Sequence, residues 1–255
     1  MKSVDVSIII VNFNTKKLVL ECIASVKKNT KTIKYEIIVV DNGSTEQFPE
    51  SKSYQLIANS TNSGFARANN QGIEVAKGKY VMLLNSDAVV KDDAIEKVYE
   101  FAEDHEDAGV VVPKLINTDK TDQASVFRFP TIGRAIKQYW LGEKGILNKY
   151  IPESETVEAA VMAAFLITPV ALKKVGKLDE KYFLYYEDID YCLRVSKARL
   201  KVYYLAGVEV MHIHGASGGM NKLLVESAKK YHGILGYYIF TFVLWSGQKL
   251  GRMMG

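Results

Sequence analysis

Short apolar runs and segments of helical periodicity alternate along residues 1–112. Strands are expected at runs such as VSIIIVNF, which is rich in β-branched residues and has the length of a buried parallel strand. Helices are expected over 16–28 and from a cap at Ser63 to a stop at Gly78. Further strands are predicted at YEIIVVDNGS, YQLIAN, YVMLLNSD and AGVVVPKL, and a third helix at KDDAIEKVYEFAED. Strands that alternate with helices predict an α/β fold, with a mostly parallel, doubly wound sheet and helices on both of its faces.

The segment 114–157 departs from this alternation. It is polar, has few periodic apolar positions and contains more Lys and Arg than Asp and Glu. Aromatic residues are interleaved with the basic ones, namely Phe127, Phe129, Tyr139 and Trp140. Long irregular segments in compact domains are usually functional or disordered. Two interpretations stay open, a long surface excursion and a flexible segment that covers a binding site.

Regular patterns return after this segment. EAAVMAAFLITP predicts a strand followed by a short helix to about Val175, and LKVYYLAGVEVMHIHG predicts two short strands. Between them, FLYYEDIDYCLR combines an aromatic run typical of a buried segment with carboxylates at the start of a helix. A helical region is predicted from about Asn221 to the end. The inward stripe of the helix that begins near residue 187 is predicted to be Ile189, Cys192, Leu193 and Ser196.

Composition narrows the class of protein. The 255 residues are 48% hydrophobic and 24% charged, which is typical of a globular chain that can bury a sizeable core. The formal net charge of +4 is too small to indicate a nucleic-acid partner, and none is predicted. Cys22 and Cys192 lie at apolar helical positions without metal-ligand spacing, so two buried thiols in a reducing compartment are expected. The start of the chain lacks a secretory signal pattern, and a cytoplasmic location is expected.

Polar residues stand at the ends of three predicted strands. Asn12 follows the first strand, Asp41 and Asn42 the second, and Asn85 to Asp87 the fourth. Ligands of open α/β sheets bind outside the carboxyl ends of the strands, so we expect these side chains to share one site. The dinucleotide pattern GxGxxG and the phosphate loop GxxxxGK[ST] are both missing, which argues against those two classes. A nucleotide can still bind at this rim, with Asp41 accepting hydrogen bonds from the base or the ribose.

Asp87 is the candidate metal ligand. A carboxylate at a strand end, beside Ser86 and Asn85, suits Mg²⁺ or Mn²⁺, which usually takes one or two carboxylates together with substrate phosphates and water. His212 and His214 follow a later predicted strand. Because alternate residues of a strand point to opposite faces, at most one of the two is expected to face the site.

Together, these motifs resemble family 2 glycosyltransferases, with the closest likeness to bacterial rhamnosyltransferase-like members that build surface polysaccharides. The likeness covers about residues 4–218 and rests on IIIVNFNT, IIVVDNGST, NSGFARANNQG, MLLNSDAVV, AAFLI, YYEDIDYCLR and HIHGAS, which occur in the family's order. The resemblance implies a GT-A fold, the nucleotide-diphospho-sugar transferase fold with a Rossmann-like central sheet. It also implies an inverting transfer from a nucleotide-diphosphate sugar, assisted by Mg or Mn.

The resemblance also implies roles for individual residues. Asp41 resembles the acid that binds the base, Asp87 the last Asp of the DxD metal motif, and Asp188 the general base of the ED pair. Asn85 stands where that metal motif has its first Asp. His212 fits the HxxGxS pattern, together with Gly215 and Ser217, and is expected to reach the metal or the diphosphate. The residues expected to bind the donor are Val11, Asn12, Phe13, Asp41, Asn42, Gly64, Phe65, Asn69, Asn85 and Ser86, and those expected to bind the acceptor are Glu187, Phe165 and Trp140.

The carboxylates of residues 187–190 are expected to differ in role. An inverting displacement needs one base, which takes a proton from the acceptor hydroxyl, and this is Asp188. For Glu187, acceptor binding and helix capping both stay open. Asp190 and Arg194 are expected to form an exposed i,i+4 pair. The helix N-terminus favours the charged form of Asp188 whereas aromatic walls raise its pKa through desolvation, and the sequence does not decide between them.

The C-terminal tail differs from the domain that precedes it. Residues 1–220 are expected to form one GT-A domain, with a nucleotide-sugar-binding half at 1–112 and an acceptor half at 113–220. The tail 221–255 is expected to be an amphipathic, apolar helical region whose apolar run is shorter than the roughly 20 residues that span a bilayer. Lysines flank that run. Membrane surface contact through 221–252 is favoured over a buried terminal helix or a homodimer contact.

The predicted function is an inverting glycosyltransferase that uses dTDP-rhamnose or a UDP-hexose. Its acceptor is expected to be a hydroxyl of a cell-surface glycan or lipid-linked acceptor, and its location the inner face of the cell membrane. One alternative is a sugar-1-phosphate nucleotidyltransferase, which would carry a GxGTR-type loop where this chain has NFNTKK. The other is a non-catalytic module that binds a nucleotide or a glycan.

Overall fold

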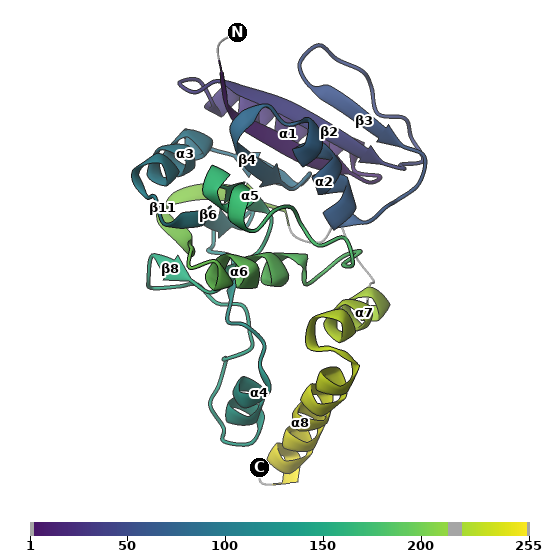
Figure 1. Cartoon of the computed structure of the whole chain (residues 1–255), viewed down its shortest axis with the longest axis vertical. Coiled ribbons are helices and arrows are strands. Elements are labelled where there is room, and N and C mark those ends of the chain that lie inside the picture. Colours follow the sequence, from purple (N-terminus) through teal and green to yellow (C-terminus); the bar gives the residue numbers. More distant parts are fainter. Residues whose placement is uncertain (1–2, 214–220, 254–255) are drawn as a thin grey trace.

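Strands and helices alternate through the first half of the computed structural model, which describes residues 3–213 and 221–253 (Figure 1). The strands are β1 (Val4–Asn12), β2 (Tyr35–Asn42), β3 (Gln55–Asn59), β4 (Gly78–Leu84), β5 (Ala88–Val90), β6 (Ala108–Ile116), β7 (Val126–Phe127), β8 (Thr156–Val157), β9 (Ala159–Ala160), β10 (Ala164–Ile167) and β11 (Lys201–His212). The helices are α1 (Lys16–Asn29), α2 (Phe65–Val75), α3 (Ala94–Asp104), α4 (Ile132–Tyr139), α5 (Pro169–Lys174), α6 (Glu187–Lys197), α7 (Asn221–His232) and α8 (Ile234–Met253).

The core of the fold is a nine-stranded sheet with the order β3-β2-β1-β4-β10-β6-β11-β5, and β8 pairs with β11 outside this path. Strands β3, β2, β1 and β4 are parallel neighbours. Strand β10 is inserted antiparallel between β4 and β6, and β6 pairs with β11 in parallel. The predicted α/β fold with a mostly parallel sheet is therefore confirmed.

Each face of the sheet carries its own hydrophobic cluster. Side chains alternate along β1, so that Ile8 and Ile10 point to one face and Ile9 to the other. Helices α1 and α3 cover the first face, whereas α2, α5 and α6 cover the second. The thiols of Cys22 and Cys192 are fully buried, one in each cluster, as the sequence predicts.

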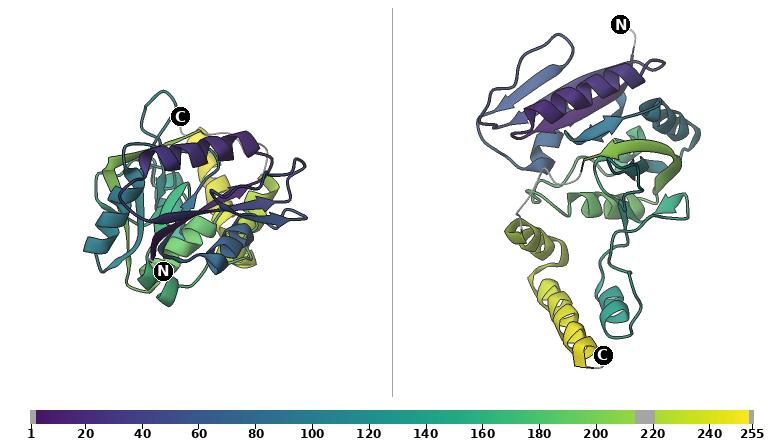
Figure 2. Two further views of the ribbon diagram at one scale, coloured as in Figure 1. Left: turned by 90° about the horizontal axis from the view of Figure 1, so that it is seen from above. Right: turned by 180° about the vertical axis from the view of Figure 1, so that it is seen from behind.

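A smaller body lies beyond the sheet, where α4 and α8 run side by side (Figures 1 and 2). Ala135 of α4 packs against Phe240 and Val243 of α8 in a separate cluster. A Cβ on Gly247 would lie 2.5 Å from the carbonyl oxygen of Tyr139, so this glycine lets α8 approach the end of α4 closely. The segment 114–157 therefore contains β7, α4 and β8 and is fastened to the C-terminal helix.

Several local predictions were wrong. One long strand, β11, replaces the two short strands, with a register irregularity between Leu205 and Glu209. Ser63 does not cap α2, because Gly64 is the N-cap and the Ser63 hydroxyl donates to Asn42 instead. In α6, Tyr191 and Val195 are buried with Ile189 and Cys192, whereas Leu193 is half-buried and Ser196 is exposed.

Candidate active site

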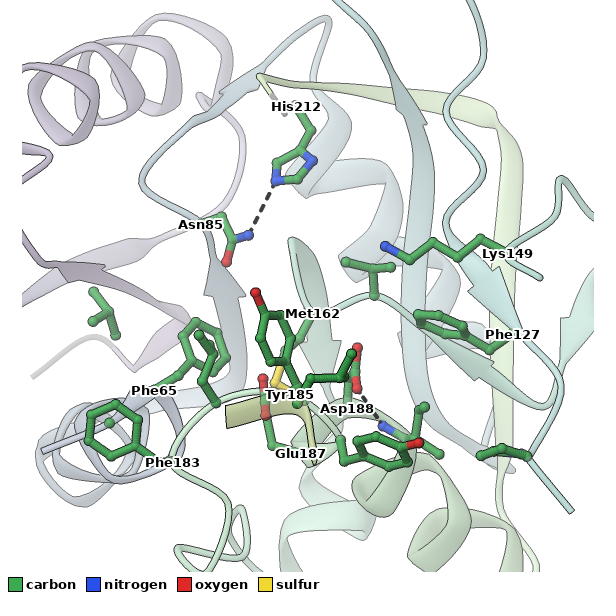
Figure 3. A pocket seen from close by; sticks show the side chains of 18 of the residues that line it. Phe65, Asn85, Phe127, Lys149, Met162, Phe183, Tyr185, Glu187, Asp188 and His212 are labelled. Atoms are coloured by element: carbon green, nitrogen blue, oxygen red, sulfur yellow. Dashed lines mark hydrogen bonds between the residues drawn. The ribbon is translucent and has the colours of Figure 1, made fainter. Parts of the chain in front are cut away.

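A cavity of about 1040 Å³ opens at the carboxyl ends of β1 and β4, in front of the first turn of α6 (Figure 3). It brings together many residues that are far apart in the sequence, including both carboxylates of the predicted ED pair. The predicted site residues that line it are Val11, Phe13, Asn42, Gly64, Phe65, Asn85, Ser86, Asp87, Glu187, Asp188 and His212.

Asn12 and Asp41 lie just behind the cavity wall. The Asn12 amide donates to Oδ1 of Asp41 at 2.9 Å and to the hydroxyl of Ser44 at 3.0 Å. The Ser44 hydroxyl in turn donates to the same Asp41 oxygen at 2.5 Å. These bonds engage Oδ1 of Asp41 alone, and they tie the end of β1 to the end of β2. The role that the structure gives Asn12 is therefore to hold the rim in shape.

A close backbone contact forms the wall beside α2. Gly64 has a φ of +89°, and a Cβ added there would lie 2.7 Å from the carbonyl oxygen of Phe183. The backbone N–H of Phe65 donates to the same oxygen at 2.7 Å. Only glycine accommodates both this conformation and this approach. The N-terminal half of the chain thus meets the loop that precedes α6 at one point of the cavity.

Asp87 and His212 meet at the polar end of the cavity. Nε2 of His212 lies 3.3 Å from Oδ1 of Asp87 and 3.2 Å from Nδ2 of Asn85. Nδ1 of His212 lies 2.8 Å from Oε1 of Gln123, whose amide nitrogen donates to Asn117 and to the His212 carbonyl. Since Oε1 can only accept, Nδ1 carries the proton and Nε2 presents a lone pair to the cavity.

This donor set fits a hard divalent cation. A carboxylate oxygen and an imidazole nitrogen at 3.3 Å are placed like two neighbouring ligands of one ion, and the Gln123 bond orients the imidazole as outer partners of metal ligands do. Within residues 3–213 and 221–253 no group of three or more His, Cys, Asp or Glu side chains could hold a metal. The remaining ligands would come from a substrate and water. His214, Gly215 and Ser217 lie outside the described residues.

The catalytic candidates stand in the first turn of α6. Tyr185 and Tyr186 both adopt left-handed backbone conformations, with φ of 69° and 70°, which cost about 1–2 kcal/mol each for residues other than glycine. Helix α7 braces this turn, because the Ser227 hydroxyl donates to the Leu184 carbonyl and Tyr231 packs on Tyr186. The aromatic run 183–186 is thus a cavity-lining loop and not the buried segment that its composition indicates.

Burial decides the protonation of the two carboxyl groups. Desolvation raises the pKa of Asp188 to about 6, against the opposing effects of the Ile189 N–H, which donates to Oδ1 at 2.8 Å, and of the Lys149 cation. The pKa of Glu187 is raised well above its ordinary value by burial and then by the Asp188 charge. Oε2 of Glu187 is buried without a hydrogen-bond partner within the described part of the chain. The open question of the sequence is answered in favour of desolvation.

Lys149 supplies a cation opposite Asp188, and it was not among the predicted site residues. Its ammonium group lies 5.2 Å from the centroid of the Phe127 ring, and both side chains line the cavity (Figure 3). Desolvation by the cavity wall lowers the pKa of Lys149, whereas the Asp188 carboxylate acts to raise it. The mix of basic and aromatic residues in 114–157 is the sequence signal for this wall, but it does not indicate which members face inward.

Three predicted site residues do not line the cavity. Phe165 is fully buried in β10, where its ring packs edge-on against Tyr191, because the strand is covered on both faces. Asn69 is buried within α2 and donates to the carbonyl of Phe65. Trp140 donates from Nε1 to the Val243 carbonyl and packs on α8, while its neighbour Tyr139 lines the cavity. The three assignments are corrected accordingly.

Asp190 forms the predicted pair with Arg194, with Nε donating to Oδ2 at 2.8 Å. The pair is not exposed, however, because Asp190 is buried and the Tyr182 hydroxyl also contacts its other oxygen at 3.4 Å. Arg194 further donates to the carbonyls of Val175 and Lys177. This carboxylate therefore stabilises the fold around α6.

The far end of the cavity is apolar and was not predicted. It is formed by side chains from the 114–157 segment and from both C-terminal helices, namely Tyr139, Leu147, Leu224, Phe240 and Leu244. One cavity thus runs from a polar end at Asp87 and His212, past the carboxylates of α6, to a wall made by α4, α7 and α8.

Known proteins identify the family. The sequence pattern described as Glycosyl transferase family 2 matches residues 7–169. Glycosyltransferase GlyG of Streptococcus pneumoniae serotype 4 is 27% identical over 217 residues, which cover 82% of this chain and 68% of GlyG. The N-acetylglucosaminyl-diphospho-decaprenol L-rhamnosyltransferase of Mycobacterium tuberculosis (strain H37Rv) is 24% identical over 208 residues, which cover 72% of this chain and 68% of that protein.

A solved structure shows the fold. The crystal structure of GalNAc-T7 with UDP, GalNAc and Mn²⁺ matches with a TM-score of 0.68 at 14% identity, over 91% of this chain and 47% of that one. The likeness confirms the predicted GT-A fold. Because the family pattern spans most of the sheet and the strand ends around the cavity, this chain belongs to glycosyl transferase family 2.

Proposed function

We propose that this glycosyltransferase is inverting and metal-assisted, and that it moves a sugar from a nucleotide-diphosphate donor to an acceptor hydroxyl. The position of Asp188 carries the proposal. Its carboxyl group faces the same cavity as the Asp87 and His212 pair, and its pKa of about 6 suits a general base near neutral pH. The cavity volume is ample for a nucleotide sugar together with part of an acceptor.

In the proposed step, a carboxylate oxygen of Asp188 takes the proton of the acceptor hydroxyl. The acceptor oxygen forms a bond to the anomeric carbon of the donor sugar while the bond from that carbon to the diphosphate oxygen breaks. The diphosphate leaves with the bonding electrons from the face opposite to the attacking oxygen. One displacement inverts the anomeric configuration, so a single base suffices.

Asp87 and His212 would hold the metal in this proposal. A bound Mg²⁺ or Mn²⁺ would neutralise the charge that grows on the leaving diphosphate. Asn85 keeps its predicted place at the strand end, where its amide contacts Nε2 of His212. An amide in place of a carboxylate lowers the negative charge of the site, so a weaker metal affinity is expected than two carboxylates would give.

The donor is proposed to be dTDP-rhamnose or a UDP-hexose. The mycobacterial relative is named as an L-rhamnosyltransferase, which supports the first, and the GalNAc-T7 structure contains UDP, which supports the second. The residues proposed to hold the nucleotide are those on the β1 and β2 side of the cavity, with Asp41 behind them offering the carboxylate oxygen that Asn12 and Ser44 leave unused.

The acceptor is proposed to be a surface glycan intermediate that is linked to a lipid. The apolar far end of the cavity would suit a hydrocarbon group, and the Lys149 ammonium between that end and Asp188 would suit a phosphate. Glu187 remains a proposed acceptor contact, because its buried Oε2 lines the cavity.

Turnover with defined donors tests the proposal. The purified chain would be incubated with dTDP-rhamnose, UDP-glucose and UDP-N-acetylglucosamine, in Mn²⁺ or in EDTA, with and without a polyprenyl-diphosphate sugar. Release of nucleoside diphosphate and an inverted anomeric centre in the product, read by NMR, are expected. Binding without turnover would instead indicate a non-catalytic module, and release of nucleoside triphosphate on addition of pyrophosphate would indicate a nucleotidyltransferase.

A further inference from the structure

The outer face of α8 is apolar and uncovered. Side chains that recur every three or four residues along one side of the helix are between 42% and 75% exposed. We call this set the outer face, and it consists of Ile234, Leu235, Tyr238, Ile239, Phe242 and Trp245. The opposite side of α8 holds Phe240, Val243 and Gly247 and packs on α4. Burial of α8 in the fold thus accounts for one side of the helix only.

The charges around the outer face are all positive. No Asp or Glu follows Glu226 in the sequence, whereas Lys229, Lys230, Lys249 and Arg252 do. The Lys249 ammonium lies 4.4 Å from the Trp245 ring centroid, and Lys229 lies 5.4 Å from that of Tyr237. Aromatic rings with lysines beside them are typical of a helix at the boundary between lipid head groups and acyl chains.

Two other occupants fit less well. No described helix is long and apolar enough to cross a membrane, which argues against a spanning role for α8. In a symmetric dimer the outer face would meet its own copy, and Lys249 would approach cationic side chains without an acidic partner. An anionic lipid surface complements both the apolar side chains and the lysines.

We infer that the outer face of α8 docks flat on a bilayer that contains anionic lipid. The helix then lies in the membrane interface, with the outer face among the upper acyl chains and the lysines among the head groups. The inner side of the same helix contributes Phe240 and Leu244 to the cavity that contains Asp188. Docking would therefore bring the apolar end of the cavity to the membrane surface.

The docked helices also contact the catalytic turn. Helix α7, which directly precedes α8, holds the loop before α6 through the bond from Ser227 to the Leu184 carbonyl. Its Tyr231 packs on Tyr186, the residue that caps α6. Lipid binding at α8 is thus placed next to the residues that position Asp188. The docking itself does not depend on the proposed transfer reaction.

Vesicle binding tests the inference. The wild-type chain is expected to co-sediment with vesicles of phosphatidylcholine and phosphatidylglycerol and to bind pure phosphatidylcholine vesicles more weakly. The double variant Tyr238→Glu/Phe242→Glu should bind the mixed vesicles at least about tenfold more weakly, because it removes two aromatic contacts and adds negative charge. The variant Leu20→Glu is the matched control, since Leu20 is 40% exposed on the distant helix α1, and it should bind as the wild type does.

Fluorescence locates the contact. Trp140 and Trp245 are the two tryptophans of the chain, so Trp140→Phe leaves Trp245 as the only indole. Brominated lipids in the mixed vesicles should quench that emission. A second variant, Lys229→Gln/Lys249→Gln, should retain the fold and lose most of the preference for anionic vesicles.

The inference is overturned by several results. These are equal binding of the double variant and the wild type, unquenched Trp245 in bound protein, or a lipid-free dimer that the double variant dissociates, which would make the face a subunit contact. Each readout is independent of sugar transfer, so loss of the proposed activity would leave the docking result interpretable.

Discussion

Nε2 of His212 lies 3.3 Å from Oδ1 of Asp87, and both atoms are acceptors in the tautomer that Gln123 fixes. Two acceptor atoms in contact repel each other, so a cation bound between them is expected to stabilise the folded protein. We expect Mn²⁺ to raise the Tm of the wild type, by the equivalent of about 2.7 kcal/mol when its concentration is a hundred times Kd. Asp87→Asn should lose most of this rise in a thermal-shift assay with Mn²⁺ or EDTA.

The matched control for the metal prediction is Asp92→Asn. Asp92 is an exposed carboxylate in the segment before α3, away from the cavity lining, and its loss should leave the Mn²⁺ effect unchanged. An equal rise in Asp87→Asn and in the wild type would assign the ion to other ligands.

Replacement of Asp188 tests the general base. Asp188→Asn is expected to lower kcat by about 10²–10⁴-fold, since the variant keeps the shape of the side chain but cannot take a proton. Its Tm at neutral pH should stay level or rise, because burial raises the pKa of this carboxyl group and the charged form is therefore disfavoured in the fold. Nucleoside diphosphate release and thermal unfolding would be measured on the same preparation.

Asp190→Asn provides the control on the same helix. It removes the charge that accepts the Arg194 bond, so a loss of about 1–3 kcal/mol in the free energy of unfolding is expected, together with near-normal transfer. A large loss of transfer in Asp190→Asn with intact folding, or near-normal transfer in Asp188→Asn, would contradict the assigned roles.

The pH profile should reveal the contact between Lys149 and Asp188. A base with a pKa of about 6 must be deprotonated to act, so kcat/KM is expected to fall as the pH drops below about 6. The Lys149 cation lowers the pKa of Asp188, and Lys149→Met should therefore shift this acidic limb to higher pH. Lys144→Met, an exposed lysine of the same segment, should leave the limb in place. Superimposable profiles for all three proteins would show that the cation does not act on the base.

The sequence predicts one side of the site well because of topology. Asn42, Asn85 and Asp87 follow parallel strands, and the carboxyl ends of such strands meet at one edge whatever the details of packing. The first turn of α6 reaches the same edge. Position along a strand does not fix side-chain direction in the same way when both faces are buried, which is why Phe165 was assigned to the site and lies in the core.

The other side of the cavity depends on contacts that local patterns do not contain. Tyr139 and Phe240 are about a hundred positions apart and share a wall only because α4 packs on α8. Trp140 has the same aromatic character as Tyr139, and one step along the helix turns it to the Val243 carbonyl. The basic and aromatic composition of 114–157 indicates a covering segment, but the choice of Lys149 as the inward cation needs the tertiary structure.

Gly64 offers a test of how the two halves of the site are joined. Gly64→Ala should lower the free energy of unfolding by about 1–3 kcal/mol, because alanine is strained at a φ of +89° and its Cβ would approach the Phe183 carbonyl to 2.7 Å. Relief of that contact would move the 183–186 loop, so KM for the donor should rise as well. Gly207→Ala is the control, since a Cβ there meets nothing within 4 Å, and denaturant unfolding with donor kinetics would compare the two. If both variants unfold like the wild type, the close contact between Gly64 and Phe183 does not constrain the site.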